Sequence, residues 1–330
     1  MPLMTIAHFP IAGQADQRRL VRVVERRPEA DGVVSLHLAA CDGGVLPDWE
    51  PGAHIDLVLP GGLTRQYSLC GDPARRDVWT IGVLLGPNSR GGSRFIHGNL
   101  AAGDTLTIAG PRNNFGLVDM ARYLFIAGGI GITPILPMVR RAAAAGAPWV
   151  LVYGGRTRRS MAFIEDIGRH AGGEVHLVPQ DEMGHPDLPR FLAGHQPDMA
   201  VYCCGPGPLI DAVEARCLMA RPASLHRERF APSTKTEAVG DDDAFEVELA
   251  RSGRRITVPE GCGLLATLEE AGYAITNSCR AGICGTCLLR VIDGTPQHND
   301  DLLSDEQRAA GNLILPCVSR SRSKLLVLDL

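Results

Sequence analysis

Four cysteines near the C-terminus have the residue type and the spacing for redox chemistry. Four residues separate Cys279 from Cys284, two separate Cys284 from Cys287, and 29 more precede Cys317. This is the spacing at which four thiolates hold a [2Fe–2S] cluster. Thiolate ligands must be ionised, and bound iron enforces that ionisation. The pattern therefore predicts an iron–sulfur centre, which carries one electron at a time.

The loop that holds such a cluster must bend sharply, so that its amide N–H groups point at the sulfur atoms. Gly282 and Gly285 stand between the cysteines, and glycine reaches positive φ angles without steric cost. Buried thiols or disulfides are the alternative, whereas zinc sites normally pair their cysteines as two short couples. The expected metal ligands are Cys279, Cys284, Cys287 and Cys317. The rest of the chain should then show where the electrons come from.

Length and composition indicate a soluble protein of two or three domains. The chain has 330 residues, of which 45% are hydrophobic and 21% charged, and its net charge is −4. It is not basic enough for a nucleic-acid partner, and no apolar run approaches the length of a membrane span. The N-terminus lacks the pattern of a secretory signal. A cytoplasmic location, where cysteines stay reduced, is therefore expected.

Residues 1–117 read as a small antiparallel β-barrel. Six short runs with partial alternation are separated by Gly, Pro and Asp turns, with almost no helix between them. They cover residues 20–25, 33–38, 49–60, 64–69, 78–84 and 104–109.

Two stretches within this segment suit a flavin. Arg65 and Tyr67 share one face of a predicted strand and Ser68 faces the other way. Arginine binds phosphate well, and tyrosine offers a flat ring and a hydroxyl. Residues 91–94 predict a glycine turn before a helix capped by Ser93, whose free N–H groups would bind a phosphate. An ordinary capped helix explains that second stretch equally well.

Residues 118–232 alternate between strand and helix, which predicts a doubly wound α/β domain with ligands at the C-terminal ends of its strands. Strands are expected at 123–127, 149–153, 174–178 and 199–204, and helices at 135–145 and 162–169. A glycine turn at 128–131 leads from the first strand to the first helix, with Thr133 as its N-cap. The turn lacks the G-x-G-x-x-G fingerprint, so a dinucleotide site is inferred from the strand–turn–helix context.

Two further features of this segment bear on nucleotide binding. Cys204 ends a strand before Gly205-Pro206 and could approach a nicotinamide ring, although a lone cysteine is more often a small buried hydrophobe. Three arginines follow the second strand, where the ribose is commonly recognised: Arg156, Arg158 and Arg159. They could bind a 2′-phosphate, and a solvated basic loop is the alternative.

The C-terminal segment follows a polar linker at 233–244 that ends in a run of acidic residues. Residues 245–249 and 254–258 alternate around Ser252-Gly253 and predict a hairpin. A short helix at 264–271 precedes the cysteine loop, and further strands are expected at 287–292 and 324–328. These parts predict a mixed sheet packed on one helix.

With its parts in this order, the chain resembles the phthalate dioxygenase reductase family, which includes vanillate O-demethylase reductases. The resemblance covers essentially everything after residue 20. Its most specific parts are the cysteine loop with Cys317, Arg65-x-Tyr67-Ser68, Gly91-Gly92-Ser93, the turn at 128–134 and Cys204-Gly205-Pro206. It implies a multidomain protein: an FMN-binding antiparallel β-barrel (1–117), an NAD-binding α/β domain (118–232), a linker (233–244) and a plant-type ferredoxin domain of the β-grasp fold (245–330).

The resemblance also implies roles for individual residues. FMN would contact Arg65, Tyr67 and Ser68, with its phosphate on the turn formed by Gly91, Gly92, Ser93 and Arg94. The pyridine nucleotide would be held by Gly128, Gly129, Gly131, Thr133, Gly205 and Pro206, with Cys204 near the nicotinamide. The segment His226-x-Glu228-x-Phe230 would place Phe230 against the flavin. The implied catalytic residues are Ser68, Cys204, Glu228 and Phe230.

The expected function follows from these cofactors. NADH gives up two electrons together and the cluster accepts one, so a flavin must lie between them. The resemblance implies a monomer that passes electrons to a separate Rieske-type aromatic hydroxylase or O-demethylase, because this sequence contains no oxygenase motif of its own. NADH is expected, and the basic loop leaves NADPH open. One alternative is a reductase for a cytochrome P450, against which the C-terminal position of the ferredoxin domain counts. A flavin and iron–sulfur redox sensor is the other.

Overall fold

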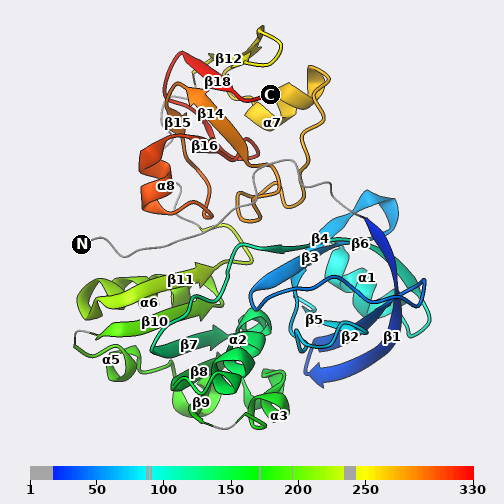
Figure 1. The fold of residues 1–330 in the computed structure, drawn as a ribbon, viewed down its shortest axis with the longest axis vertical. Coiled ribbons are helices and arrows are strands. Elements are labelled where there is room, and N and C mark those ends of the chain that lie inside the picture. The colour runs from blue at the N-terminus through cyan, green and yellow to red at the C-terminus, as the bar shows by residue number, and fades with distance from the viewer. Residues whose placement is uncertain (1–17, 87–88, 90, 171, 195, 234–242) are drawn as a thin grey trace. The chain divides into compact units, whose positions relative to one another are not determined.

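The computed structural model describes residues 18–330 apart from 87–88, 90, 171, 195 and 234–242. The described chain divides into two compact units, residues 18–230 and 231–330 (Figure 1). The first unit contains both the barrel and the α/β part. Most of the predicted linker lies outside the described residues. Among the described residues, no helix is both long enough and apolar enough to cross a membrane.

The first part of the chain is the predicted curled antiparallel sheet. Its six strands lie in the order β4-β3-β6-β1-β2-β5, and a bridge between Leu69 and Ile81 brings the end of β4 to β5. Inward-facing side chains such as Ile55 and Trp79 fill the barrel. The strands are β1 (Arg19–Ala30), β2 (Val33–Ala40), β3 (Ala53–Val58), β4 (Thr64–Ser68), β5 (Trp79–Leu84) and β6 (Thr105–Asn113). A short 3-10 turn, η1 (Pro60–Gly62), precedes β4, and α1 (Gly92–Asn99) lies between β5 and β6.

The second part is a five-stranded parallel sheet in the order β11-β10-β7-β8-β9. Alternate residues of β7 enter two separate cores: Phe125 lies in the core that contains α2, and Ile126 in the core that contains α6. This confirms the doubly wound prediction. The strands are β7 (Arg122–Gly128), β8 (Trp149–Gly155), β9 (Gly173–Pro179), β10 (Gln196–Cys204) and β11 (Pro222–Glu228). The helices are α2 (Ile132–Ala144), α3 (Ile164–Ile167), α4 (Gln180–Met183), α5 (Leu188–Phe191) and α6 (Gly207–Ala220), with 3-10 turns η2 (Gly129–Gly131) and η3 (Arg158–Ser160).

Three details of the predicted helices are wrong. Helix α2 begins at Ile132 with Gly131 as N-cap, so Thr133 lies inside the helix, where its hydroxyl donates to Ile130 O at 2.9 Å. Helix α1 likewise begins after Gly91, and Ser93 is a helical residue rather than the cap. In both cases the glycine turn itself enters the helix. The helix predicted at 162–169 is limited to the four residues of α3, which follow Phe163 in a left-handed conformation.

The second unit is a mixed sheet in the order β13-β12-β18-β14-β16. β12 and β18 are parallel, while β12–β13 is the predicted hairpin. α8 is an additional helix that the sequence analysis missed, although Ser304 and Gln307 form a capping box at its start. The elements are β12 (Phe245–Leu249), β13 (Arg254–Val258), α7 (Leu264–Glu270), β14 (Leu289–Asp293), β15 (Pro296–Gln297), α8 (Asp305–Ala310), β16 (Leu313–Ile314), β17 (Arg320–Ser321) and β18 (Leu325–Leu328).

Candidate functional site

The four cysteines of the second unit lie together as two interacting pairs. The side chain of Cys279 is hydrogen-bonded to Cys284, and that of Cys287 to Cys317. Cys284 also acts electrostatically on Cys317, so the two pairs are neighbours. Among the described residues, no three His, Cys, Asp or Glu side chains surround a point suited to one metal ion. Thiols arranged two by two instead fit a binuclear cluster, in which the protein supplies two sulfur ligands to each iron.

The loop between these cysteines directs backbone N–H groups at sulfur, as the sequence predicts. Ala281 donates its N–H to Cys279 Sγ at 3.3 Å, and Thr286 donates to Cys284 Sγ at 3.5 Å. The hydrogen bond with Cys284, supported by backbone N–H groups, lowers the pKa of Cys279 to about 6. Gly282 has a φ of 70°, and a Cβ there would lie 2.7 Å from Val318 Cγ2. Only glycine fits that bend, so the loop is built to expose its amides to sulfur.

A corner suited to an anionic group forms where Arg65 of β4 meets the start of α1. A Cβ added to Gly92 would lie 2.5 Å from Arg65 Cγ, so the arginine stem lies directly on the helix start. Gly91 has a φ of 93° and turns the chain into the helix. A helix N-terminus and a guanidinium together favour an anionic group. Ser93 donates its hydroxyl to Ser89 Oγ at 2.8 Å, so it braces the turn. The side chain of Arg94 is exposed.

Tyr67 and Ser68 leave β4 on opposite faces. Tyr67 packs against the barrel core, and burial raises the pKa of its hydroxyl to about 12. Ser68 is 5% exposed and stands opposite His54 of β3. A protonated tyrosine and an enclosed serine hydroxyl are both suited to bind a polar aromatic ring.

The glycine turn after β7 packs tightly against the end of β10. A Cβ on Gly131 would lie 2.2 Å from Cys204 O, and one on Gly128 would lie 2.6 Å from Pro206 Cδ. Cys204, Gly205 and Pro206 therefore share one corner with the turn, at the C-terminal ends of two parallel strands. Ligands of doubly wound sheets bind at such ends. Cys204 is fully enclosed, and burial raises its thiol pKa well above the usual value.

Thr133 and Gly129 lie on either side of this turn but face different surroundings. A Cβ on Gly82 of β5 would lie 2.8 Å from Thr133 Cγ2, so the threonine methyl packs on the barrel. Gly129 has a φ of 54° and open space where a side chain would stand. The turn is therefore packed against the barrel at Thr133 and has open space beside it at Gly129.

Glu228 lies at the end of β11 as the register partner of Cys204. Its Oε2 is enclosed without a hydrogen-bond partner in the described part of the chain, and burial raises its pKa to about 8. Phe230, two residues further on, is 42% exposed. The sequence analysis missed Arg229 between them, whose side chain is 7% exposed and donates to Asp211 of α6 at 2.7 Å. This ion pair anchors the segment that carries both predicted residues.

The three arginines after β8 are not equivalent. Arg159 Nε pairs with Asp31 Oδ2 at 3.2 Å, in the turn between β1 and β2. Arg156 and Arg158 have exposed side chains. Thr157, which lies between these two arginines, is the N-cap of η3 and forms a reciprocal pair of hydrogen bonds with Ser160. One of the three candidate 2′-phosphate ligands is therefore engaged with the barrel.

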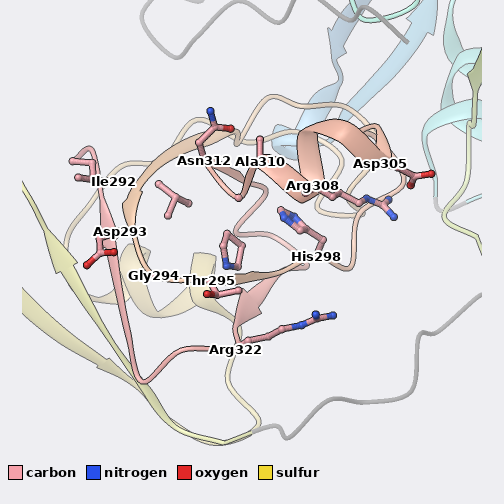
Figure 2. A pocket seen from close by; sticks show the side chains of 14 residues that line it. Ile292, Asp293, Gly294, Thr295, His298, Asp305, Arg308, Ala310, Asn312 and Arg322 are labelled. Atoms are coloured by element: carbon pink, nitrogen blue, oxygen red, sulfur yellow. The ribbon is translucent and has the colours of Figure 1, made fainter. Parts of the chain in front are cut away.

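A cavity of about 650 Å³ lies in the second unit, away from every predicted site residue. His298, Asp305, Arg308 and Arg322 are among its lining residues (Figure 2). Behind this wall, Asp300 Oδ1 accepts the N–H groups of two following residues, and Asp301 N–H donates to Gly282 O in the cysteine loop. The segment that follows His298 in the cavity wall therefore also supports the cysteine loop.

Two family models match parts of the chain. Residues 247–322 match the 2Fe-2S iron-sulfur cluster binding domain, and residues 125–215 match the oxidoreductase NAD-binding domain. The phenoxybenzoate dioxygenase subunit beta of Ectopseudomonas oleovorans is 44% identical over 91% of this chain and 94% of its own length. The vanillate O-demethylase oxidoreductase of Pseudomonas putida is 43% identical over 93% and 98%.

Solved structures agree with these relatives. A phthalate dioxygenase reductase has a TM-score of 0.68 at 32% identity, with 96% of this chain and 99% of that chain covered. An intact type IV self-sufficient cytochrome P450 monooxygenase has a TM-score of 0.89 at 38% identity over 95% of this chain. This chain spans only 41% of that longer protein. The same set of parts thus occurs joined to a cytochrome P450, so the position of the ferredoxin domain does not exclude a P450 acceptor. The chain is an NAD(P)H-dependent iron–sulfur oxidoreductase and belongs to the phthalate dioxygenase reductase family, whose members serve as reductase subunits of multicomponent oxygenases.

Proposed function

We propose that the protein carries electrons from NADH through FMN and a [2Fe–2S] cluster to a separate Rieske-type oxygenase that acts on an aromatic substrate. The observation that carries this proposal is that one chain contains three sites, one suited to each of the three cofactors. These are the paired cysteines, the phosphate-binding corner at Arg65 and the glycine turn against Cys204. The names of the relatives, a dioxygenase subunit and an O-demethylase oxidoreductase, support the class of acceptor.

Bound FMN accepts two electrons together and releases them singly, which is the chemistry that joins a nicotinamide to a one-electron cluster. Arg65 and the start of α1 bind its phosphate, and Tyr67 and Ser68 orient its ring. The compact corner supports FMN, because the sequence offers no adenine-binding segment in the barrel. Thr133 packs on Gly82 of β5 and so fixes the nucleotide turn against the barrel.

The nucleotide corner orients the nicotinamide by shape and keeps charge away from it. Gly128 and Gly131 let the turn lie against Cys204 without a side chain between them. Cys204 and Glu228 are both neutral at pH 7, since burial raises both pKa values. Phe230 offers an exposed ring to cover the flavin and exclude water. NADH is proposed over NADPH on the strength of the family; the ion pair of Arg159 with Asp31 is largely exposed and leaves the three arginines as the residues to test if NADPH is used.

We also infer that the protein acts as a monomer in the cytoplasm. All ten cysteines are free thiols in the described structure, which supports a reducing compartment. Size-exclusion chromatography with light scattering tests the oligomeric state, and a dimer mass would contradict it.

Three measurements on the purified holoprotein test the proposed function. Heat-released flavin should run as FMN on chromatography, and finding FAD would refute that assignment. The kcat/KM for NADH should exceed that for NADPH. Electrons should reach a purified Rieske oxygenase and support turnover of its aromatic substrate. Efficient NADH oxidation without transfer to any Rieske partner would contradict the proposed acceptor.

A cytochrome P450 is the second candidate acceptor, because the self-sufficient monooxygenase contains this same set of parts. Mixing the reduced protein with a P450 under carbon monoxide separates the two candidates. Faster reduction of the haem than of a Rieske cluster, at equal concentrations, would favour the P450.

A further inference from the structure

His54 lies on the outer face of the barrel, beside a residue that the flavin site uses. β3 lies between β4 and β6 in the sheet, and His54 is the register partner of Ser68 on β4 and of Arg112 on β6. Directly opposed residues in an antiparallel sheet share a face, with Cβ atoms about 4.5–5.5 Å apart. The strand neighbours of His54, Ala53 and Ile55, belong to the barrel core. His54 and Ser68 therefore stand side by side outside the core.

The imidazole of His54 is enclosed, yet neither of its nitrogens has a partner in the part of the chain that the structure describes. The residue is 6% exposed, and both Nδ1 and Nε2 are buried without a hydrogen bond. Buried polar groups are almost always hydrogen-bonded, so an exception requires an explanation. The hydroxyl of Ser68, once oriented by a ligand that binds beside it, can supply a partner for one of the two nitrogens.

The charges around His54 keep its ring neutral. Burial lowers its pKa to about 4, Arg112 acts in the same direction, and the Asp56 carboxylate opposes both. Arg112 is itself paired with Asp56, whose Oδ2 lies 2.5 Å from the guanidinium. A neutral imidazole offers one N–H donor and one bare nitrogen that accepts a hydrogen bond.

We propose that His54 is a positioning residue of the flavin site that acts through Ser68. With flavin bound, the Ser68 hydroxyl donates a hydrogen bond to the bare ring nitrogen of His54, so that the lone pairs of Ser68 Oγ face the polar edge of the flavin ring. A serine held in this way is an acceptor toward the flavin. It favours the reduced flavin, which presents an N–H, over the oxidised flavin, which presents a lone pair. This inference rests on the proposed function, which places Ser68 against the flavin.

The test compares His54→Leu, His54→Asn, Ser68→Ala and the double variant, using the FMN dissociation constant of the apoprotein and the flavin midpoint potential. His54→Leu should weaken FMN binding roughly 3- to 10-fold, as the loss of one neutral hydrogen bond predicts, and should lower the potential. His54→Asn retains an acceptor and should stay within about twofold of wild type. The double variant should lose no more FMN affinity than the more affected single variant, because one residue acts through the other. Additive losses, or an unchanged potential in His54→Leu, would overturn the inference.

His37→Leu is the matched control, because His37 is a partly buried histidine of β2 whose ring contacts Ser35 and Thr80. It should leave FMN affinity and potential unchanged. If His54→Leu does not fold, histidine-selective ¹⁵N spectra of the wild-type protein decide: the His54 ring signals must move when FMN binds, and static signals would refute the inference. A wild-type protein that binds no flavin at all would defeat the proposed function as well. Flavin binding that His54→Leu leaves intact would defeat this inference alone.

Discussion

At the scale of single residues, burial sets the protonation states on which the nucleotide corner depends. Glu228 and Cys204 face each other in register at the ends of β11 and β10. Desolvation is the largest influence on both pKa values among the described residues, so both groups hold their protons. A charged nucleotide at the proposed site would therefore meet two neutral side chains here.

The pKa of Glu228, raised to about 8, predicts a specific pH dependence. The native state holds this proton more tightly than the unfolded chain does, so stability falls as pH rises from about 4.5 to about 8. Reduction of the flavin by NADH should slow over the upper part of that range, as the buried carboxylate forms. Stopped-flow rates between pH 6 and 9 measure this decline. Glu228→Gln keeps the shape and cannot ionise, so an alkaline decline that persists in this variant would assign it to another group.

Gly131→Ala should damage the nucleotide site directly. Its new methyl would lie 2.2 Å from Cys204 O, a backbone atom that cannot move aside freely. The overpacked turn should cost about 1–3 kcal/mol of stability and weaken nicotinamide binding by roughly tenfold or more. Titration with NAD⁺ and thermal unfolding measure the two effects. Gly168→Ala is the control, since its Cβ would lie no closer than 3.6 Å to its neighbours; equal losses in both variants would refute the packing argument.

At the scale of elements, most of the strands and helix α2 could be predicted because their patterns reflect burial, whereas the 14-residue helix α6 and strand β11 were not predicted. The alternation in β12 and β13 around Ser252-Gly253 is an example, since the hairpin forms as expected. The helix starts could not be predicted as well. At α1 and α2 a serine or threonine looks like the cap, but a glycine two residues earlier takes that position. Gly91 is required by its φ of 93°, and Gly131 by its approach to Cys204 O, from which a Cβ would lie only 2.2 Å.

Asp300 shows how an element outside the cysteine loop supports that loop. Its side chain is fully buried. Burial raises the pKa of this carboxyl, but the His298 ring 3.6 Å away, the hydrogen bond from the Leu303 N–H and nearby Arg308 outweigh burial and leave the pKa lowered. A Cβ added to Gly282 would lie 3.0 Å from the Asp300 Cα, so the two backbones are packed closely. The ionised form is thus the one that the fold binds, so its stabilisation is present above the ordinary aspartate range and is lost as pH falls through the lowered pKa.

Asp300→Asn should therefore destabilise the second unit by about 1–3 kcal/mol, the cost of leaving buried donors without an ionised acceptor. Cluster absorbance should disappear at lower urea concentration than in wild type, and its acid sensitivity should weaken. Asp293→Asn is the control: Asp293 lines the same cavity (Figure 2) but is exposed, and its loss should change stability little. A wild-type urea profile in Asp300→Asn would contradict the assigned role.

At the scale of the whole molecule, the order of parts was predictable because each part has its own period or spacing. The cysteine spacing indicates the cluster, the buried run at 123–127 indicates the parallel sheet, and their sequence along the chain indicates the family. Residues whose roles depend on strand pairing or on tertiary packing could not be predicted from the sequence. His54 stands 14 positions before Ser68 and becomes its neighbour only through the pairing of β3 with β4. Arg229 finds Asp211 only when α6 packs beside β11.

Separation of the chain into two units predicts that the cluster can be removed without loss of the other two sites. Cys284→Ala deletes one thiol of a pair, so the second unit should not retain its cluster. The residues of the proposed flavin and nucleotide sites all lie in the first unit, so NADH should still reduce FMN and a dye that accepts electrons from flavin, at near the wild-type rate. Transfer to cytochrome c and to the oxygenase should collapse, because these one-electron acceptors draw from the cluster.

Iron and flavin content, dye reduction and oxygenase-coupled turnover measure each part separately. Full coupled turnover without the cluster would mean that electrons bypass it, whereas loss of dye reduction with FMN retained would mean that the two units depend on each other for hydride transfer.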